Sequence, residues 1–462
     1  MKIKFLPFLI LALLPINLTA SENKMKFGRF GEVTIYGGGN RSAKHFIIFL
    51  SGDGGWNKGV VDMAAALTGL DSVVAGVSVP AYLKNLKSSK GRCYYPASDF
   101  ESLSHYLQKK LEFNNYLKPS LVGYSSGATM VYGILSQAPP GTFQGAISLG
   151  FCSDLEIDRP FCKGHGLEQV PLKKGFDFKP DPGLENPWFV LNGMADKVCP
   201  IEGQRKFISQ TKNATLIELP KVGHGFGVQK NWMPQFKDAF LKFSEYTPEP
   251  EKIIIGDLND LPLIELKSDS KKDTLIVILS GDGGWASIDK EMAKELNSQG
   301  FSVVGLDSLK YFWNSKSPTS LGKAMERIGT YYIKEWKQQN IIWIGYSMGA
   351  DVLPFGLSRL DPYLKQKTLG AALLGPSNFA EFEFHLTNWL SNKSSGGLEI
   401  KPELEKLKDM KFICIQGQND EEKGCDLVTN DNFLKLVFPG GHHFSGDYPL
   451  LAKKILERFS LN

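Results

Sequence analysis

The chain has 462 residues, of which 42% are hydrophobic and 22% are charged, a composition that is ordinary for globular domains and excludes a disordered or coiled-coil protein. The formal net charge is only +4, and no Lys/Arg-rich run occurs, so nucleic-acid binding is not indicated. At roughly 150 residues per domain, the length predicts two or three domains.

The first 20 residues have the pattern of an export signal. Lys2 and Lys4 precede an apolar run over 5–14, and Leu18-Thr19-Ala20 offers a cleavage site. The alternative is a retained membrane anchor, but the run is shorter than the ~20 residues that a spanning helix needs. We therefore expect residues 1–20 to be a cleaved signal peptide and the mature protein to be exported.

Short apolar runs alternate with helical patterns along the rest of the chain, which predicts a doubly wound, mostly parallel α/β sheet in each half. The runs suit strands that are covered on both faces. The predicted strands of the first half are 45–50, 72–79, 120–122, 146–149 and 188–191. Those of the second half are 261–266, 274–279, 301–306, 341–344, 371–374, 411–415 and 433–438.

Three motifs occur twice in the same order, which indicates duplication of a whole domain rather than a short solenoid repeat. They are Ser-Gly-Asp-Gly-Gly-Trp at 51–56 and 280–285, Gly-x-Ser-x-Gly at 123–127 and 345–349, and Gly-His-x-Phe at 223–226 and 441–444. A Pro/Glu stretch at 244–251 reads as a linker. We expect domains at 25–246 and 261–462, joined by a linker at 247–260.

Six cysteines fit an oxidising compartment, where disulfides persist. Spacing favours Cys152 with Cys162 and Cys414 with Cys425, which leaves Cys93 and Cys199 to pair. Sequence alone does not fix the pairing, because six cysteines allow fifteen connectivities, and buried free thiols are the alternative. No spacing typical of a metal site occurs, so we expect no metal and no organic cofactor.

Each Gly-x-Ser-x-Gly motif lies between a predicted strand and a predicted helix (128–135 and 350–357), as in the nucleophile elbow of α/β hydrolases. In that fold the acid and the histidine follow the serine along the chain. In the second half this order gives Ser347, Asp420 and His442. His442 is favoured over His443 because it aligns with the histidine of the first half.

The first half holds a second candidate triad in the same order, Ser125, Asp196 and His224. A serine hydroxyl becomes a good nucleophile only when a histidine accepts its proton, and a carboxylate fixes the histidine tautomer. Taken singly, each of these residues is an ordinary turn residue; their order and duplication favour catalysis.

The Ser-Gly-Asp-Gly-Gly-Trp loop follows an early strand, where α/β hydrolases place an oxyanion hole. We expect the backbone N–H groups of Gly281, Asp282 and Met348 to form it. The Asp282 carboxylate would repel an oxyanion, so one hypothesis is that it binds a positive group on the substrate with Asp307, Asp351 and Trp313. The alternative is a loop-fixing or helix-capping aspartate.

Aromatic residues gather between 378 and 390, at Phe379, Phe382, Phe384 and Trp389. We expect this segment to be an amphipathic helix packed on the sheet; the alternatives are a cap over the site and a lipid-facing surface.

The motifs at 279–285, 305–313, 345–351 and 441–448 resemble the VirJ/AcvB family of bacterial virulence proteins. The VirJ domain is similar to nearly all of the second half, and the exported two-domain layout is similar to AcvB. The resemblance implies a periplasmic serine hydrolase that cleaves the aminoacyl ester of aminoacyl-phosphatidylglycerol, chiefly the lysyl form. The membrane phospholipid would be its substrate, and type IV secretion components would be partners.

The first half departs from the family pattern, with Ser126 in place of Met348 and Thr129 in place of Asp351. Two other functions remain open: a non-catalytic periplasmic accessory protein of type IV secretion, since fold does not imply function, and a general esterase or peptidase. The sequence gives neither the amino acid on the lipid, nor the oligomeric state, nor whether the first domain is catalytic.

Overall fold

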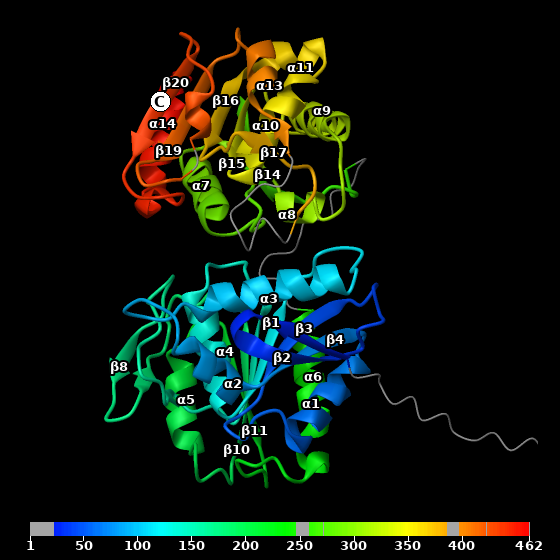
Figure 1. The fold of residues 1–462 in the computed structure, drawn as a ribbon, viewed down its shortest axis with the longest axis vertical. Coiled ribbons are helices and arrows are strands. Elements are labelled where there is room, and N and C mark those ends of the chain that lie inside the picture. The colour runs from blue at the N-terminus through cyan, green and yellow to red at the C-terminus, as the bar shows by residue number, and fades with distance from the viewer. Residues whose placement is uncertain (1–22, 246–257, 271, 386–396, 422, 462) are drawn as a thin grey trace, which may run out of the picture.

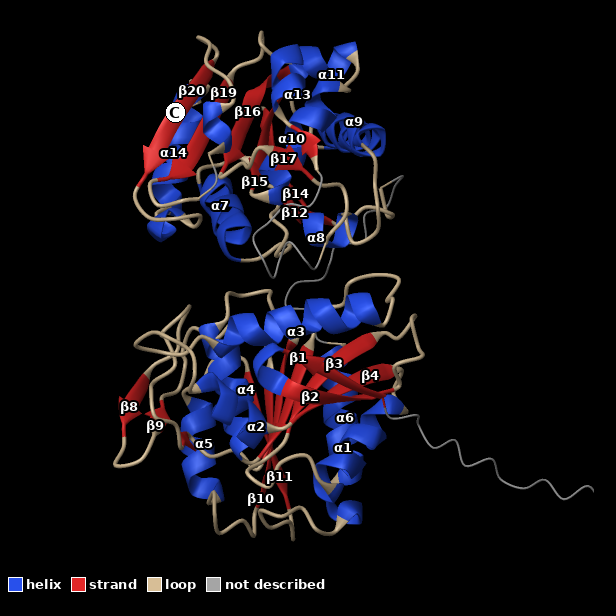
Figure 2. Ribbon diagram, viewed as in Figure 1, coloured by secondary structure: helices blue, strands red, loops and turns tan. Residues whose placement is uncertain are grey.

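A computed structural model describes residues 23–245, 258–270, 272–385, 397–421 and 423–461. It contains two α/β units, each built around one large sheet (Figures 1 and 2). The expected signal peptide at 1–20 and residues 247–257 of the expected linker lie outside the described residues. Among the described helices, none has both the length and the apolar character needed to cross a bilayer.

The N-terminal sheet has the strand order β1-β2-β4-β3-β5-β6-β10-β11. Its six strands from β4 to β11 are parallel, and β1 and β2 add an antiparallel edge. The strands are β1 (Asn23–Phe27), β2 (Gly31–Tyr36), β3 (His45–Leu50), β4 (Ser72–Val77), β5 (Ser120–Tyr124), β6 (Gly145–Leu149), β10 (Trp188–Gly193) and β11 (Ala214–Leu219).

Helices cover both faces of this sheet, which explains why its central strands are apolar throughout. One face packs on α1 (Lys58–Thr68) and α6 (Met233–Ser244). The other packs on α2 (Val79–Leu86), α3 (Pro96–Lys110), α4 (Ser126–Gln137) and α5 (Ile201–Ser209). A small sheet of β7 (Asp154–Leu155), β8 (Gln169–Pro171) and β9 (Phe176–Phe178) lies in the insertion between β6 and β10.

The C-terminal sheet repeats this plan with the order β12-β14-β13-β15-β16-β19-β20, in which only β12 is antiparallel. Its strands are β12 (Leu263–Leu266), β13 (Thr274–Leu279), β14 (Ser302–Leu306), β15 (Asn340–Tyr346), β16 (Thr368–Leu374), β19 (Phe412–Gly417) and β20 (Phe433–Phe438). The helices are α7 (Ser287–Ser298) and α14 (Tyr448–Arg458) on one face, and α9 (Pro318–Glu335), α10 (Met348–Ser358), α11 (Pro362–Lys367) and α13 (Lys401–Lys406) on the other.

The fold class predicted from the sequence is confirmed, and the strands differ from expectation mainly at their ends. The strand expected at 72–79 stops at Val77, because Val79-Pro80 begins α2 and proline suits the first turn of a helix. The strand expected at 261–266 starts at Leu263. Neither the antiparallel edge of β1 and β2 nor the parallel strand β11 was predicted.

The aromatic segment at 378–390 is not a helix where it is described. It forms β17 (Phe379–Ala380), paired with β18 (Leu398–Glu399). Phe382 then packs against Phe312 and Phe355 in the second core. Trp389 lies outside the described residues.

The three disulfides join Cys93 to Cys162, Cys152 to Cys199, and Cys414 to Cys425. Only the last pairing was predicted by spacing; the pairings of Cys152 with Cys162 and of Cys93 with Cys199 were wrong. Cys152 follows β6 and Cys199 follows β10, and these strands are parallel neighbours, so their carboxyl ends bring the two cysteines together across 47 residues of sequence.

The amino ends of the N-terminal strands pack against the carboxyl ends of the C-terminal strands. Phe113 and Tyr116, which precede β5, contact Trp313, which follows β14 and the short helix α8 (Ser308–Tyr311). Glu185, which precedes β10, pairs with Lys290 of α7 at 2.7 Å. Figure 1 shows α3 along this junction, opposite α7 and α8. The two domains are therefore stacked head to tail.

A small apolar cluster of Tyr116, Leu309, Trp313 and Phe384 holds the junction. Trp313 is 1% exposed, and its indole N–H donates to the Phe113 carbonyl at 2.9 Å. Lys109 of α3 donates to the Trp313 carbonyl and lies 4.7 Å from the centre of the Trp313 ring. Trp313 is thus the anchor of the interdomain contact, a role that differs from the substrate contact suggested by sequence.

Replacing Trp313 with alanine should uncouple the two domains, because it removes the buried ring that packs against side chains of both domains. We expect a loss of about 3–5 kcal/mol at the junction and the appearance of two calorimetric unfolding transitions in place of one. Tyr363→Ala, at an exposed position in the same domain, is the control. An unchanged single transition in Trp313→Ala would show that the junction does not couple the domains.

Candidate active site

Both serines of the Gly-x-Ser-x-Gly motifs sit on the same strained turn. Ser125 has φ 56° and ψ −123°, and Ser347 has φ 51° and ψ −121°, in a region that non-glycine residues rarely adopt. Each serine N–H donates to the last residue of the neighbouring strand, Leu149 or Leu374, at 2.9 Å. These turns have the geometry of a nucleophile elbow, with the serine at the carboxyl edge of the sheet.

The N-terminal triad is fully hydrogen-bonded. Ser125 Oγ lies 3.0 Å from His224 Nε2, and His224 Nδ1 lies 2.8 Å from Asp196 Oδ2. The other oxygen of Asp196 accepts the N–H groups of Val198 and Cys199 at 2.8 and 2.9 Å. These bonds fix the carboxylate so that it can orient the histidine and stabilise its protonated form.

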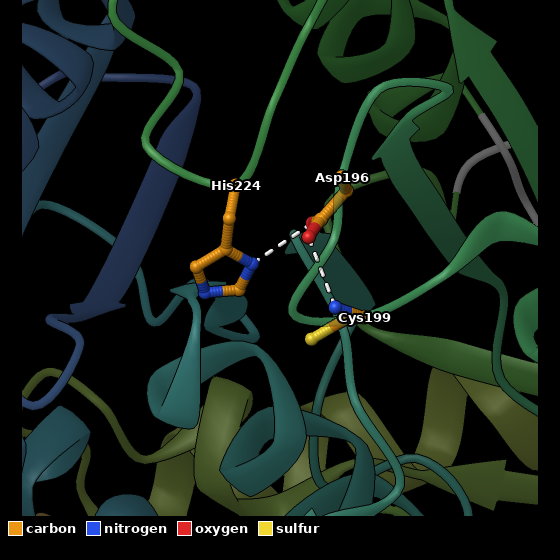
Figure 3. A group of neighbouring side chains, drawn as sticks. All are labelled: Asp196, Cys199 and His224. Carbon is orange, nitrogen blue, oxygen red and sulfur yellow. Dashed lines mark hydrogen bonds and ion pairs between the residues drawn. The ribbon is translucent and has the colours of Figure 1, made fainter.

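Asp196, Cys199 and His224 also lie close enough together to suggest a metal site, as Figure 3 shows. Cys199 is bonded to Cys152 in a disulfide, so it has no thiolate to offer a metal. His224 Nδ1 and one Asp196 oxygen are already paired with each other. The arrangement is that of a catalytic dyad braced by a disulfide, not of a metal centre.

The C-terminal triad is assembled in part. His442 Nδ1 lies 2.8 Å from Asp420 Oδ2, and Tyr346, next to Ser347, packs 5.3 Å from the His442 ring. No hydrogen bond joins Ser347 to His442 in the described structure. His443 Nδ1 lies 3.2 Å from the Tyr346 hydroxyl. The histidine that pairs with Asp420 is therefore His442, the one that the sequence register favoured.

The Ser-Gly-Asp-Gly-Gly-Trp loops lie against the two serines. A Cβ added at Gly52 would be 3.0 Å from Ser125 Cβ, and one added at Gly281 would be 3.5 Å from Ser347 Cβ. Met348 is the first residue of α10, so its N–H has no partner within the helix. The expected oxyanion donors Gly281, Asp282 and Met348 therefore border the Ser347 elbow.

A buried carboxyl group that the sequence did not reveal contacts this loop. Asp289 of α7 is 3% exposed, and its Oδ2 accepts the Gly281 N–H at a long 3.5 Å. Its other oxygen is buried and has no partner in the described structure. Burial raises the pKa of Asp289 well above its usual value, because it disfavours the charged form. Its position on an amphipathic helix gave no sign of this role.

Of the three carboxylates suggested for a substrate cation, two have structural partners. Asp307 caps α8 by accepting the Lys310 N–H at 3.1 Å, and Asp351 accepts the Ser377 N–H at 2.6 Å. Asp282 is therefore the candidate that is left for binding a substrate cation. Burial raises its pKa, while the nearby His442 and the backbone N–H groups of Asp282 and Gly283 lower it.

Glu101 of α3 brings a further carboxyl group to Asp282 from the N-terminal domain. Burial raises the pKa of Glu101 to about 8, and the negative charge of Asp282 adds to the rise. Sequence reasoning missed this residue because 181 positions separate it from Asp282 (282 − 101). Only the head-to-tail packing brings Glu101 near Asp282, which itself lies near His442.

The two halves are thus α/β-hydrolase-fold domains with serine, histidine and aspartate at the position where that fold carries its active site. A model of the family described as "Bacterial virulence protein (VirJ)" matches residues 273–461. Residues 273–461 are therefore similar to the VirJ family, in agreement with the motifs.

Solved structures with likeness to this chain include an esterase domain from Rhodothermus marinus, at 12% identity and TM-score 0.35, over 49% of this chain and 99% of that one. A lidless α/β serine hydrolase from Xanthomonas campestris shows 16% identity and TM-score 0.32, over 50% and 97% of the two chains. Est1E from Butyrivibrio proteoclasticus shows 13% identity and TM-score 0.33, over 48% and 98%. No curated protein matches the chain.

The Glu101 carboxyl group makes stability depend on pH in the unliganded protein. A carboxyl group with a raised folded-state pKa contributes stability that is fully present below its unfolded pKa near 4.5 and is lost as the pH rises through about 8. We therefore expect the thermal midpoint to fall more between pH 6 and pH 9 in wild type than in Glu101→Gln, which stays neutral.

Scanning calorimetry at the two pH values measures this difference. Glu405→Gln, at an exposed position of the C-terminal domain, is the control and should follow wild type. Equal falls in wild type and Glu101→Gln would contradict the raised pKa of Glu101.

Proposed function

We propose that the protein is an exported, periplasmic serine hydrolase that cleaves the aminoacyl ester of aminoacyl-phosphatidylglycerol, with the lysyl form as first candidate. The observation that carries the proposal is the Ser347 elbow beside the paired His442 and Asp420, in a domain that matches the VirJ family. Export rests on the pattern of the first 20 residues.

In the proposed reaction, His442 accepts the proton of Ser347 while the serine oxygen attacks the ester carbonyl. The N–H groups at Gly281 and Met348 stabilise the resulting oxyanion, and each such donor is worth about 3–4 kcal/mol. His442 then gives the proton to the departing glycerol hydroxyl of the lipid. Water, deprotonated by the same histidine, releases the amino acid from Ser347.

An aminoacyl ester also carries an ammonium group, and the acidic pair of Asp282 and Glu101 supports its recognition. The two carboxyl groups interact electrostatically, and Asp282 also interacts with His442. A bound cation would favour the ionised forms of both groups and relieve their mutual repulsion. The lysyl form, which has two ammonium groups, gains most from this charge.

A non-catalytic role in type IV secretion is the second candidate, because Ser347 and His442 are not hydrogen-bonded in the described structure. Active-site hydrogen bonds are often long in unliganded enzymes and tighten when substrate binds. A fluorophosphonate probe separates the two functions, since only an activated serine reacts. A general esterase is distinguished by a panel of esters.

Replacing Ser347 with alanine should abolish release of amino acid from the lipid, with a loss of about 10⁴-fold or more. The measurement incubates purified protein with lipid extract and follows the head groups by chromatography. Ser298→Ala, at an exposed serine of the same domain, is the control. Full activity of Ser347→Ala would exclude Ser347 as the nucleophile.

Reversing the charge at Asp282 should remove the preference for cationic substrates. We expect Asp282→Lys to raise KM for lysyl esters about tenfold or more relative to esters with a neutral amide in place of the side-chain amine, because it replaces attraction by repulsion. Glu101→Gln should show a smaller change in the same direction. An unaltered ratio in both variants would rule out the acidic pair as the ammonium site.

A further inference from the structure

The N-terminal domain holds a catalytic constellation that the proposed reaction at Ser347 does not use. Ser125, His224 and Asp196 are joined by hydrogen bonds of 3.0 and 2.8 Å, and Asp196 is held by two further backbone bonds. The Cys152–Cys199 disulfide ties the acid loop to the loop after β6. This degree of support is what a working nucleophile requires.

The oxyanion side of this site is also present. Gly52 lies against Ser125. Val60 has the sequence position that corresponds to Asp289, which accepts the Gly281 N–H in the second domain, and a valine side chain cannot accept such a bond from Gly52. Ser126 begins α4 and supplies the second backbone N–H. A carbonyl oxygen above Ser125 would therefore meet two donors.

The surroundings of Ser125 lack the carboxyl groups that surround Ser347. Ser78 lies near Gly55, in the position that Asp307 has near Gly284. Thr129 corresponds to Asp351: its hydroxyl donates to the Cys152 carbonyl, whereas the Asp351 carboxylate accepts the Ser377 N–H. Asp53, the counterpart of Asp282, is exposed to solvent. Three carboxyl groups near Ser347, those of Asp289, Asp307 and Asp351, thus have uncharged counterparts near Ser125.

Exposed apolar side chains flank the acid and follow the histidine of the first domain along the chain. Met194, Val198 and Val228 are 49%, 65% and 52% exposed, and they lie on the loops that carry Asp196 and His224. The second domain has Gln418 in place of Met194 and Gly446 in place of Val228. Exposed apolar side chains on the loops that carry the acid and the histidine are candidates for a substrate contact.

We propose that the N-terminal domain is a second serine hydrolase site, centred on Ser125, that cleaves carboxylic esters with an uncharged apolar acyl group. Ser125 Oγ forms a bond to the acyl carbon as the ester C–O bond breaks, and His224 moves the serine proton to the departing alkoxide. Water then adds to the acyl-serine, gives its proton to His224, and leaves with the acyl group as a carboxylic acid. The serine regains its proton, so the site is restored without any other reactant.

The head-to-tail stacking keeps this site open. The junction uses the amino edge of the N-terminal sheet, whereas Ser125 lies at its carboxyl edge, at the opposite end of the strands. The two sites therefore work separately, and the Ser125 site is testable in protein that lacks Ser347.

The test uses the full chain carrying Ser347→Ala, so its outcome does not depend on the proposed function. We expect a fluorophosphonate probe to label Ser125, identified by peptide mass, and p-nitrophenyl butyrate to be hydrolysed. Adding Ser125→Ala should lower this hydrolysis at least 100-fold, whereas adding Ser209→Ala, at an exposed serine, should leave it unchanged. A folded Ser347→Ala protein that is neither labelled at Ser125 nor active on the ester would overturn the proposal.

The acyl preference has a separate test in the same background. Val198→Asp with Val228→Asp should lower the ratio of kcat/KM for p-nitrophenyl octanoate over acetate about tenfold, because these two loops no longer accept an apolar chain. Val437→Asp, at a similarly exposed valine on β20 of the other domain, is the control. An unchanged ratio in the double variant would refute the assignment of an apolar acyl group.

Discussion

The close approach of one helix to the centre of each sheet is the constraint on which both sites depend. A Cβ at Gly349 would lie 2.1 Å from the Leu279 carbonyl oxygen, and one at Gly127 would lie 2.4 Å from that of Ser51. Only glycine permits this contact, which holds α10 and α4 directly beneath the elbow. The preceding serine is forced to positive φ, a strain of about 1–3 kcal/mol that the packing of the helix offsets.

The same framework carries two different chemical environments. In both domains the serine, histidine and acid come from the carboxyl ends of corresponding parallel strands, and the Gly-rich loop lies against the serine. The side chains around them differ: Asp289 and Asp307 in the second domain correspond to Val60 and Ser78 in the first. The two domains thus share the placement of the three residues on the fold, whereas the side chains around them differ, and fold alone does not fix the substrate.

The stacking of the domains makes the N-terminal domain part of the C-terminal site. The carboxyl edge of the second sheet, where ligands bind in open α/β sheets, faces α3 and the loops before β5 and β10. His105 of α3 contacts Phe384 at this junction, and burial lowers the pKa of His105 to about 3, so it packs there as a neutral ring. The first domain therefore contributes both a cover and, through Glu101, a carboxyl group.

The sequence by itself determined the fold class, the duplication and the candidate triads, because strand hydrophobicity, the two glycines of each elbow and the order of serine, acid and histidine are local signals. Only the tertiary structure decided the pairing of Cys93 with Cys162 and of Cys152 with Cys199, and the roles of Glu101, Asp289 and Trp313. Each of these depends on which strand ends lie side by side or on how the domains stack. Those are contacts between residues far apart in the chain, and spacing along the sequence does not encode them.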